Sequence, residues 1–302
     1  MKSPLIPLMY FWLQTWLEIP PVRGQVELNL VPDAVDDQYI GCANKMDGVV
    51  PGLLEKEKSM SSRFSMVWET SEEKWQEVKT KLPLPTGFKD EHGRAIVAYT
   101  DNAFYRVFND AVKSTGTSRD NYMTSFHFKA FHYYLTRALQ LLRGKCDETY
   151  KMAVYRGVTD IRFQHKGSSP IRFGQFASSS IQKQRAEGFG TDTFFTIHTC
   201  FGVDIRAFSH SPEEEEVLIP VHEMFSVVPE KGSKINSYVL RSTNRTCSYF
   251  NCAYLGRNKD QTCVYNSATR GGVVFPGGMS PSLFGGSVIL IHAAVLKLTD
   301  GF

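Results

Sequence analysis

The chain has 302 residues, of which 42% are hydrophobic and 13% aromatic, so it can bury a substantial core as one large domain or two small ones. Its formal net charge is +3, and the absence of a lysine or arginine block argues against a nucleic-acid-binding surface. The six cysteines form no Cys-x-x-Cys pair, which favours disulfides in an oxidising compartment over a zinc site.

The first 24 residues predict a secretory signal peptide. Lys2 is followed by an apolar run through Leu13 that is too short to span a bilayer, and Gly24 closes the stretch as a small residue. A buried N-terminal helix is the alternative, but the prolines of the stretch disfavour it. Entry into the secretory pathway would also make Asn244, in the sequence Asn-Arg-Thr, an acceptor for N-glycosylation.

Residues 25–147 predict a mostly helical segment. The acidic pair at 36–37 is expected to cap its first helix, and apolar residues recur at helical spacing over 64–78. The apolar run 95–100 fits either a strand or the start of a helix. An apolar stripe predicts a further helix over 126–143.

Residues 148–265 predict a β-rich half of the same domain. Short runs of β-branched and aromatic residues alternate with turns rich in glycine, serine and lysine, which is typical of all-β or sandwich-like structure. The expected strands are 152–158, 171–181, 194–200, 217–220, 224–228, 237–241 and 247–255.

The stretch 266–302 is expected to be a flexible tail with a candidate glycolipid-anchor signal. A spacer rich in glycine, serine and proline precedes the apolar run 287–296, as in such signals. Lys297 and Asp300 follow the apolar run and depart from the pattern, so a secreted tail is the alternative.

Three polar features in the β-rich half stand out by their order along the chain. Arg156 lies at the end of a predicted strand, a serine cluster occupies 178–180, and four glutamates occupy 213–216. In an extended chain alternate side chains share a face, so Glu214 and Glu216 are expected to point the same way. Each feature alone is a common surface pattern.

Together the three features resemble the active site of the arginine-specific mono-ADP-ribosyltransferases, in particular their vertebrate extracellular branch. The resemblance covers about residues 30–263, and the segments that carry it are 36–42, 126–129, 141–144, 174–180, 216–220 and 251–256. It implies an α+β fold in which the helical part packs on a two-sheet β core with an NAD-binding cleft. It also implies NAD as co-substrate, no permanently bound cofactor, no metal, and acceptor proteins that carry arginine.

The resemblance implies a role for each of four polar residues. Glu216 would bind the ribose 2′-hydroxyl and stabilise the cationic ribose left when nicotinamide departs. Arg156 would bind the pyrophosphate, and Ser178 would hold the nicotinamide ribose and orient Glu216. Glu214 would hold the guanidinium of the acceptor arginine, because in this family Glu at this position goes with arginine and Gln with other acceptors.

Further positions match those that line the NAD cleft of the family. Gly157 would let the backbone approach the nicotinamide amide. Phe189 would stack on the nicotinamide ring, with simple core packing as the alternative. The other matching positions are Tyr99, Gln175, Ser180 and Ser209.

The resemblance also implies the disulfides Cys42–Cys252 and Cys146–Cys200, and it leaves open whether the remaining Cys247 and Cys263 pair with each other. The implied activity is that of an NAD(P)-dependent protein-arginine mono-ADP-ribosyltransferase that acts outside the cell, either secreted or attached to the cell surface by a lipid anchor alone. NAD hydrolysis is expected beside transfer. A pure NAD glycohydrolase and a catalytically silent surface-binding protein are the alternatives, and the intact polar residues argue against the silent one.

Overall fold

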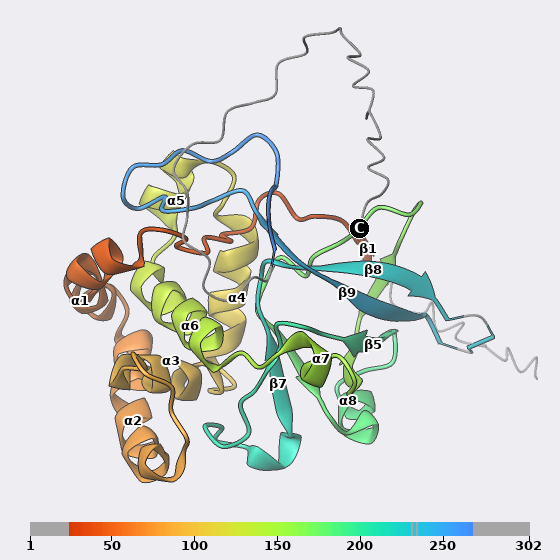
Figure 1. The fold of residues 1–302 in the computed structure, drawn as a ribbon, viewed down its shortest axis with the longest axis horizontal. Coiled ribbons are helices and arrows are strands. Elements are labelled where there is room, and N and C mark those ends of the chain that lie inside the picture. Colours follow the sequence, from red (N-terminus) through yellow and green to blue (C-terminus); the bar gives the residue numbers. More distant parts are fainter. Residues whose placement is uncertain (1–23, 231, 234, 268–302) are drawn as a thin grey trace, which may run out of the picture. The chain divides into compact units, whose positions relative to one another are not determined.

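The computed structural model describes residues 24–267 except 231 and 234 (Figure 1). The predicted signal peptide and anchor signal therefore lie almost wholly outside the described residues. The helices are α1 (Ala43–Met60), α2 (Ser62–Val78), α3 (Asp90–Tyr99), α4 (Phe104–Ser114), α5 (Arg119–Ser125), α6 (Lys129–Leu142), α7 (Cys146–Thr149) and α8 (Lys183–Gly188), with 3-10 turns η1 (Lys79–Lys81) and η2 (Pro212–Glu214). The helices α1 to α6 gather on one side of the sheet in Figure 1.

The strands form one large sheet and one small one. They are β1 (Gly24–Glu27), β2 (Val154–Val158), β3 (Ile161–Gln164), β4 (Ala177–Ser180), β5 (Thr193–His198), β6 (Val203–Asp204), β7 (Glu216–Ile219), β8 (Glu223–Pro229), β9 (Ser237–Ser248) and β10 (Val264–Ser267). The eight-stranded sheet has the order β10-β9-β5-β2-β4-β7-β6, with β8 paired to β9, and β1 pairs with β3. This confirms the α+β class and makes β2, β4 and β7 neighbours.

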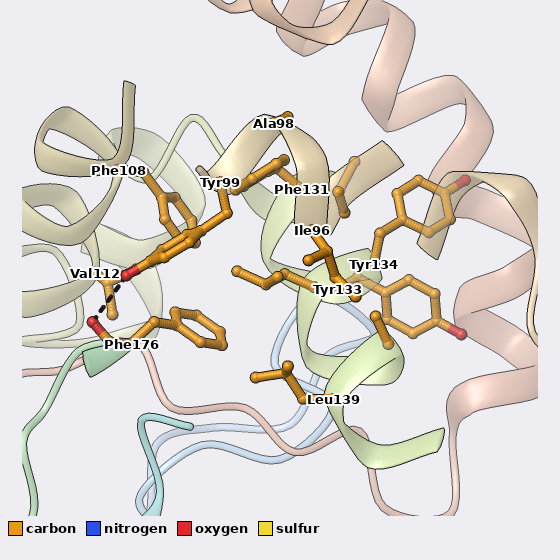
Figure 2. Close-up of a cluster of buried hydrophobic side chains, with 14 of the residues drawn as sticks. Ile96, Ala98, Tyr99, Phe108, Val112, Phe131, Tyr133, Tyr134, Leu139 and Phe176 are labelled. Atoms are coloured by element: carbon orange, nitrogen blue, oxygen red, sulfur yellow. Dashed lines mark hydrogen bonds between the residues drawn. The ribbon is translucent and has the colours of Figure 1, made fainter. Parts of the chain in front are cut away.

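Aromatic side chains of α3, α4 and α6 form a core that reaches the sheet at β4. The ring of Phe108 stacks on Phe176, with centroids 5.6 Å apart, and Phe131 packs edge-on against Phe108 at 4.7 Å. Figure 2 shows the Tyr99 hydroxyl pointing at the backbone oxygen of Phe176, to which it donates a hydrogen bond of 3.1 Å. Because Phe176 directly precedes β4, this core fixes the helical half against that strand.

Asp36 and Asp37 do not cap a helix, and that prediction is wrong. Both side chains are fully buried, and α1 begins only at Ala43. The two carboxylates accept hydrogen bonds of 2.8–2.9 Å from four backbone N–H groups within 249–253. They therefore provide hydrogen-bond acceptors for the backbone N–H groups of the turns that follow β9. Burial raises the pKa of Asp37 to about 6.

The buried side chain of Arg172 links the N-terminal segment that carries Asp36 to the end of β9. Its guanidinium donates to Asp36 Oδ2 at 2.5 Å and to the backbone oxygen of Leu30 at 2.6 Å and 2.8 Å. It also donates to the backbone oxygen of Cys247 at 2.5 Å. A buried ion pair is stable only when its remaining donors and acceptors are satisfied, and here the surrounding carbonyls satisfy them.

Helix α6 begins three residues later than predicted, and a carboxylate from another helix caps it. Glu57 of α1 accepts hydrogen bonds from the backbone N–H groups of Ala130 at 2.7 Å and Phe131 at 3.3 Å. These groups have no partner within the helix, so a buried carboxylate suits this position. Burial raises the pKa of Glu57 to about 8.

Three other predicted elements also differ in the structure. β4 takes up only the last part of the predicted strand 171–181, because Gly174 at φ 66° breaks the extended backbone. The predicted strand 247–255 is divided between the end of β9 and the turns bound by Asp37. The ambiguous run 95–100 belongs to helix α3 and its C-terminal cap.

Disulfides join Cys42 to Cys252, Cys146 to Cys200 and Cys247 to Cys263. The first two are the pairs that the resemblance implies, and the third joins the remaining cysteines. Within the part of the chain that the structure describes, no helix has the length and apolar character needed to cross a membrane.

Replacing the Cys42–Cys252 pair by serines should destabilise the protein more than replacing the Cys247–Cys263 pair. The first bridge closes a loop with a sequence separation of 210 and the second one of 16. In the loop-entropy model these are worth about 5 and about 3 kcal/mol. Chemical denaturation of the two double variants measures the difference, and an equal or greater loss for the shorter loop would refute it.

Candidate active site

The end of α3, the start of α4 and the strands β2, β4 and β7 enclose a cleft of about 330 Å³. Eight of the predicted site residues line it: Tyr99, Arg156, Gly157, Ser178, Ser180, Phe189, Glu214 and Glu216. Gln175 and Ser209 are not among the lining residues. The Ser209 hydroxyl instead accepts a hydrogen bond from the backbone N–H of Ser211 at 3.0 Å, inside the loop that leads to η2.

Strand register brings the central residues of the cleft together. β4 and β7 are antiparallel, with Ser180 opposite Glu216 and Ser178 opposite Leu218. Arg156, from the neighbouring strand β2, donates a hydrogen bond of 2.6 Å from its guanidinium to the backbone oxygen of Ser178. Residues distant in the sequence thus face one cleft because their strands are adjacent in the sheet.

Glu216 is the buried acid of the cleft, with only 7% of its surface exposed. Burial raises its pKa to about 7, and the negative charge of Glu214 acts in the same direction. A hydrogen bond from Ser178 and the positive charge of Arg156 oppose this rise in pKa. The carboxylate is therefore poised to interact with a positive charge that enters or develops in the cleft.

Tyr99 and Asn109 form a polar support behind Ser178. The Tyr99 hydroxyl lies 3.4 Å from Ser178 Oγ and accepts a hydrogen bond of 3.0 Å from Asn109 Nδ2. Asn109 also bonds the backbone of Phe176 through both its amide nitrogen and its amide oxygen. This network restricts the Ser178 hydroxyl, which in turn bonds Glu216. Sequence reasoning missed Asn109 because helix α4 was not predicted.

Glu214 and Glu216 both line the cleft, but not through the extended backbone that was predicted. Glu214 ends the 3-10 turn η2, Glu215 has a left-handed backbone with φ 47° and ψ 51°, and only Glu216 begins β7. The prediction that the two side chains share one face of a strand is therefore wrong, because only Glu216 belongs to the strand. Their convergence comes from the turn.

Ser180 holds this turn rather than leaving its hydroxyl free in the cleft. Its hydroxyl donates to the backbone oxygen of Glu214 at 2.7 Å and accepts from the backbone N–H of Gln182 at 3.1 Å. The backbone N–H of Ile181 donates to the oxygen of Glu215 at 3.1 Å. The end of β4 thus fixes the backbone that carries both glutamates.

Gly157 is required by the packing of α8 on β2. A Cβ atom at this position would lie 2.1 Å from the backbone oxygen of Ala186 and 2.3 Å from that of Gly190. The close approach brings Phe189, at the end of α8, to the cleft, where 55% of its surface is exposed. The core-packing alternative for Phe189 is therefore wrong, and its ring is free to contact a ligand.

The N-terminal end of α4 and the turn before it contribute lining residues that sequence reasoning missed: Asn102, Tyr105 and Arg106. The Arg106 guanidinium donates from Nε to the Tyr105 hydroxyl at 3.1 Å and adds a second positive charge to the cleft. Two arginines and two glutamates in one cleft suit a ligand that carries phosphates at one end and develops positive charge at the other. Within residues 24–267, excluding the two undescribed positions, no group of three or more His, Cys, Asp or Glu could hold a metal ion.

Comparison with known proteins gives one consistent family. Residues 28–248 match the family described as NAD:arginine ADP-ribosyltransferase. The chain is 47% identical to ecto-ADP-ribosyltransferase 5 of Rattus norvegicus over 248 residues, covering 80% of each chain. It is 45% identical to the Homo sapiens ecto-ADP-ribosyltransferase 5 over 268 residues, 86% of this chain and 91% of the relative.

The solved structures agree with these sequence matches. The crystal structure of the mono-ADP-ribosyltransferase ART2.2 superimposes with a TM-score of 0.67 at 41% identity, covering 76% of this chain and 99% of that one. Two ART2.2 variants, solved in complex with NADH and with NAD, superimpose with the same TM-score of 0.67 at 40% identity.

Gly157→Ala should lower stability, because the new methyl group meets backbone that cannot move without displacing α8. Overpacking of this kind costs about 1–3 kcal/mol. Gly188→Ala, in the helix α8 that packs on Gly157, is the control, since its Cβ would have no heavy atom within 4 Å. Thermal unfolding of both variants tests the prediction. A Gly157→Ala variant as stable as Gly188→Ala would contradict the packing account.

Proposed function

The chain belongs to the NAD:arginine ADP-ribosyltransferase family, and from this premise we propose that it transfers ADP-ribose from NAD to arginine side chains of extracellular or cell-surface proteins. The observation that carries the proposal is the buried Glu216 carboxylate in one cleft with Arg156 and Glu214. The ART2.2 complexes with NAD and NADH support NAD as the co-substrate.

Bound NAD would lie with its pyrophosphate toward Arg156 and its nicotinamide ribose toward Ser178 and Glu216. The Arg156 guanidinium is fixed by its bond to Ser178, so its remaining donors are pre-oriented for phosphate oxygens. As the bond to nicotinamide breaks, positive charge develops on the ribose, and the Glu216 carboxylate stabilises it. Phe189 offers an exposed ring for the nicotinamide.

Glu214 would bind the acceptor. A carboxylate binds a guanidinium through two parallel, charge-assisted hydrogen bonds. A neutral side chain in place of Glu214 would bind the guanidinium more weakly. Burial and the neighbouring Glu213 both raise the pKa of Glu214, while Arg185 lowers it. An arriving guanidinium would bring a further positive charge and so favour the ionised carboxylate.

Hydrolysis of NAD would accompany transfer, because water can reach the same ribose cation when no arginine is bound. A pure NAD glycohydrolase is the alternative function, and Glu214 in the cleft favours transfer over it. A silent binding protein is disfavoured, because the cleft keeps Arg156, Ser178 and Glu216 together.

We propose an extracellular location, which three disulfides and the names of the ecto-ADP-ribosyltransferase relatives support. Asn244 is exposed on β9, as a glycosylation acceptor must be. Secretion and attachment by a lipid anchor both fit this location, and the segment on which they differ lies outside the described residues.

Glu216→Gln should abolish both transfer and hydrolysis while NAD binding stays largely intact. The carboxylate acts on charge that exists only in the transition state, so its loss should lower turnover by about a hundredfold or more. Labelled NAD with free arginine, and NAD titration by calorimetry, measure the two effects. Glu213→Gln removes an equal charge from the same run and is the control. Wild-type turnover in Glu216→Gln would refute the catalytic role.

Glu214→Gln should separate the two activities. The variant loses the charge that pairs with guanidinium, which costs about 1.5–3 kcal/mol, or roughly tenfold to a hundredfold in transfer. Water makes no such contact, so hydrolysis should fall far less. Arginine labelling and nicotinamide release are measured in the same preparation. If both fall in parallel, Glu214 does not select the acceptor.

A further inference from the structure

Glu215 lies between the two glutamates of the cleft, yet its own side chain is directed elsewhere. It borders a separate groove of about 780 Å³ and does not line the cleft. Gln182 Nε2 donates to Glu215 Oε1 at 2.8 Å, and Arg206 NH1 lies 3.9 Å from Glu215 Oε2. The carboxylate therefore connects the residue just before α8 with the loop that precedes η2.

Arg206 is itself held from the other side. Its guanidinium donates to Asp204 Oδ1 at 3.0 Å and Oδ2 at 2.7 Å, and Asp204 of β6 pairs with Val217 of β7. Two-point contact of this kind fixes the orientation of an arginine. A chain of contacts thus runs from the edge strand β6 through Arg206 and Glu215 to Gln182. We call it the Glu215 bridge.

The backbone explains why the bridge matters. Glu215 has φ 47°, a conformation that a residue other than glycine adopts only where its surroundings hold it. Glu214 precedes this residue and is outside β7, so its backbone is held by the Ser180 hydroxyl and not by the hydrogen bonds of the strand. Glu216, by contrast, is fixed by its pairing with Ser180.

We infer that Glu215 is a positioning residue for the acceptor side of the reaction. The Glu215 bridge holds the left-handed turn, and the turn directs Glu214 toward the acceptor guanidinium. The bridge therefore sets the ratio in which the ribose cation reacts with arginine or with water, although the bridge contacts neither arginine nor water. This inference rests on the proposed function and deepens it. Cleavage of the nicotinamide bond depends on Glu216 and should not depend on the bridge.

The test compares two substitutions at one position. Glu215→Asn introduces a residue that tolerates the left-handed backbone. Its side chain is too short to reach Gln182 and Arg206. Glu215→Gln keeps the length and an amide oxygen that can accept from Gln182. Glu213→Gln removes a neighbouring charge without touching the bridge. The full chain is incubated with labelled NAD and increasing free arginine, and the arginine adduct and nicotinamide are measured together.

In Glu215→Asn the KM for arginine should rise, and the ratio of adduct to nicotinamide should fall by about fivefold or more. Nicotinamide release without arginine should stay near wild type. Glu215→Gln should recover most of the ratio, Gln182→Ala should reproduce the loss, and Glu213→Gln should leave the ratio unchanged. Thermal unfolding of each variant verifies folding.

Three results would overturn the inference: an unchanged ratio in Glu215→Asn, a parallel fall of adduct and nicotinamide release, or no recovery in Glu215→Gln. A wild-type chain that releases no nicotinamide from NAD would instead remove the proposed function on which the inference rests. Wild-type transfer with an unaltered partition in Glu215→Asn would leave the proposed function standing and reject the bridge alone.

Discussion

The antiparallel register of β4 and β7 is the constraint on which the cleft depends. It sets Ser180 opposite Glu216, and the adjacent β2 brings the Arg156 guanidinium to the backbone oxygen of Ser178. Since successive side chains of a strand point to opposite faces, a slip of one residue would turn Glu216 out of the cleft. The bond from Ser180 to the backbone of Glu214 extends the same register into the turn that carries the second glutamate.

The position of Glu216 also explains why the proposed chemistry suits this cleft. A largely buried carboxylate is poorly stabilised in the free protein, which is why its pKa is raised. The same low-polarity setting strengthens its interaction with a cation that forms nearby. The buried contacts of Asp36 and Arg172, together with the Cys42–Cys252 disulfide, join the N-terminal segment to the end of β9.

The sequence predicted the fold class and most cleft residues, but through resemblance more than through local pattern. Glu214 illustrates the limit: alternation in a strand predicted the correct cleft for the wrong reason, since the left-handed Glu215 is a tertiary outcome. The acidic pair at 36–37 looked like a helix cap, whereas its partners lie more than 200 residues away. Asn109 and Arg106 were missed because helix α4, which carries both residues, was not predicted.

We propose that an ionised, buried Glu216 drives cleavage of the nicotinamide bond. The dependence of kcat/KM for nicotinamide release on pH tests it most directly, because this ratio reports ionisations of the free enzyme. Burial raises the pKa of Glu216 to about 7, so activity should be low in acid, rise through a midpoint near that value and level off above it. A profile that is flat between about pH 5 and 9, or one with its midpoint near the ordinary glutamate value of about 4.3, would contradict the account.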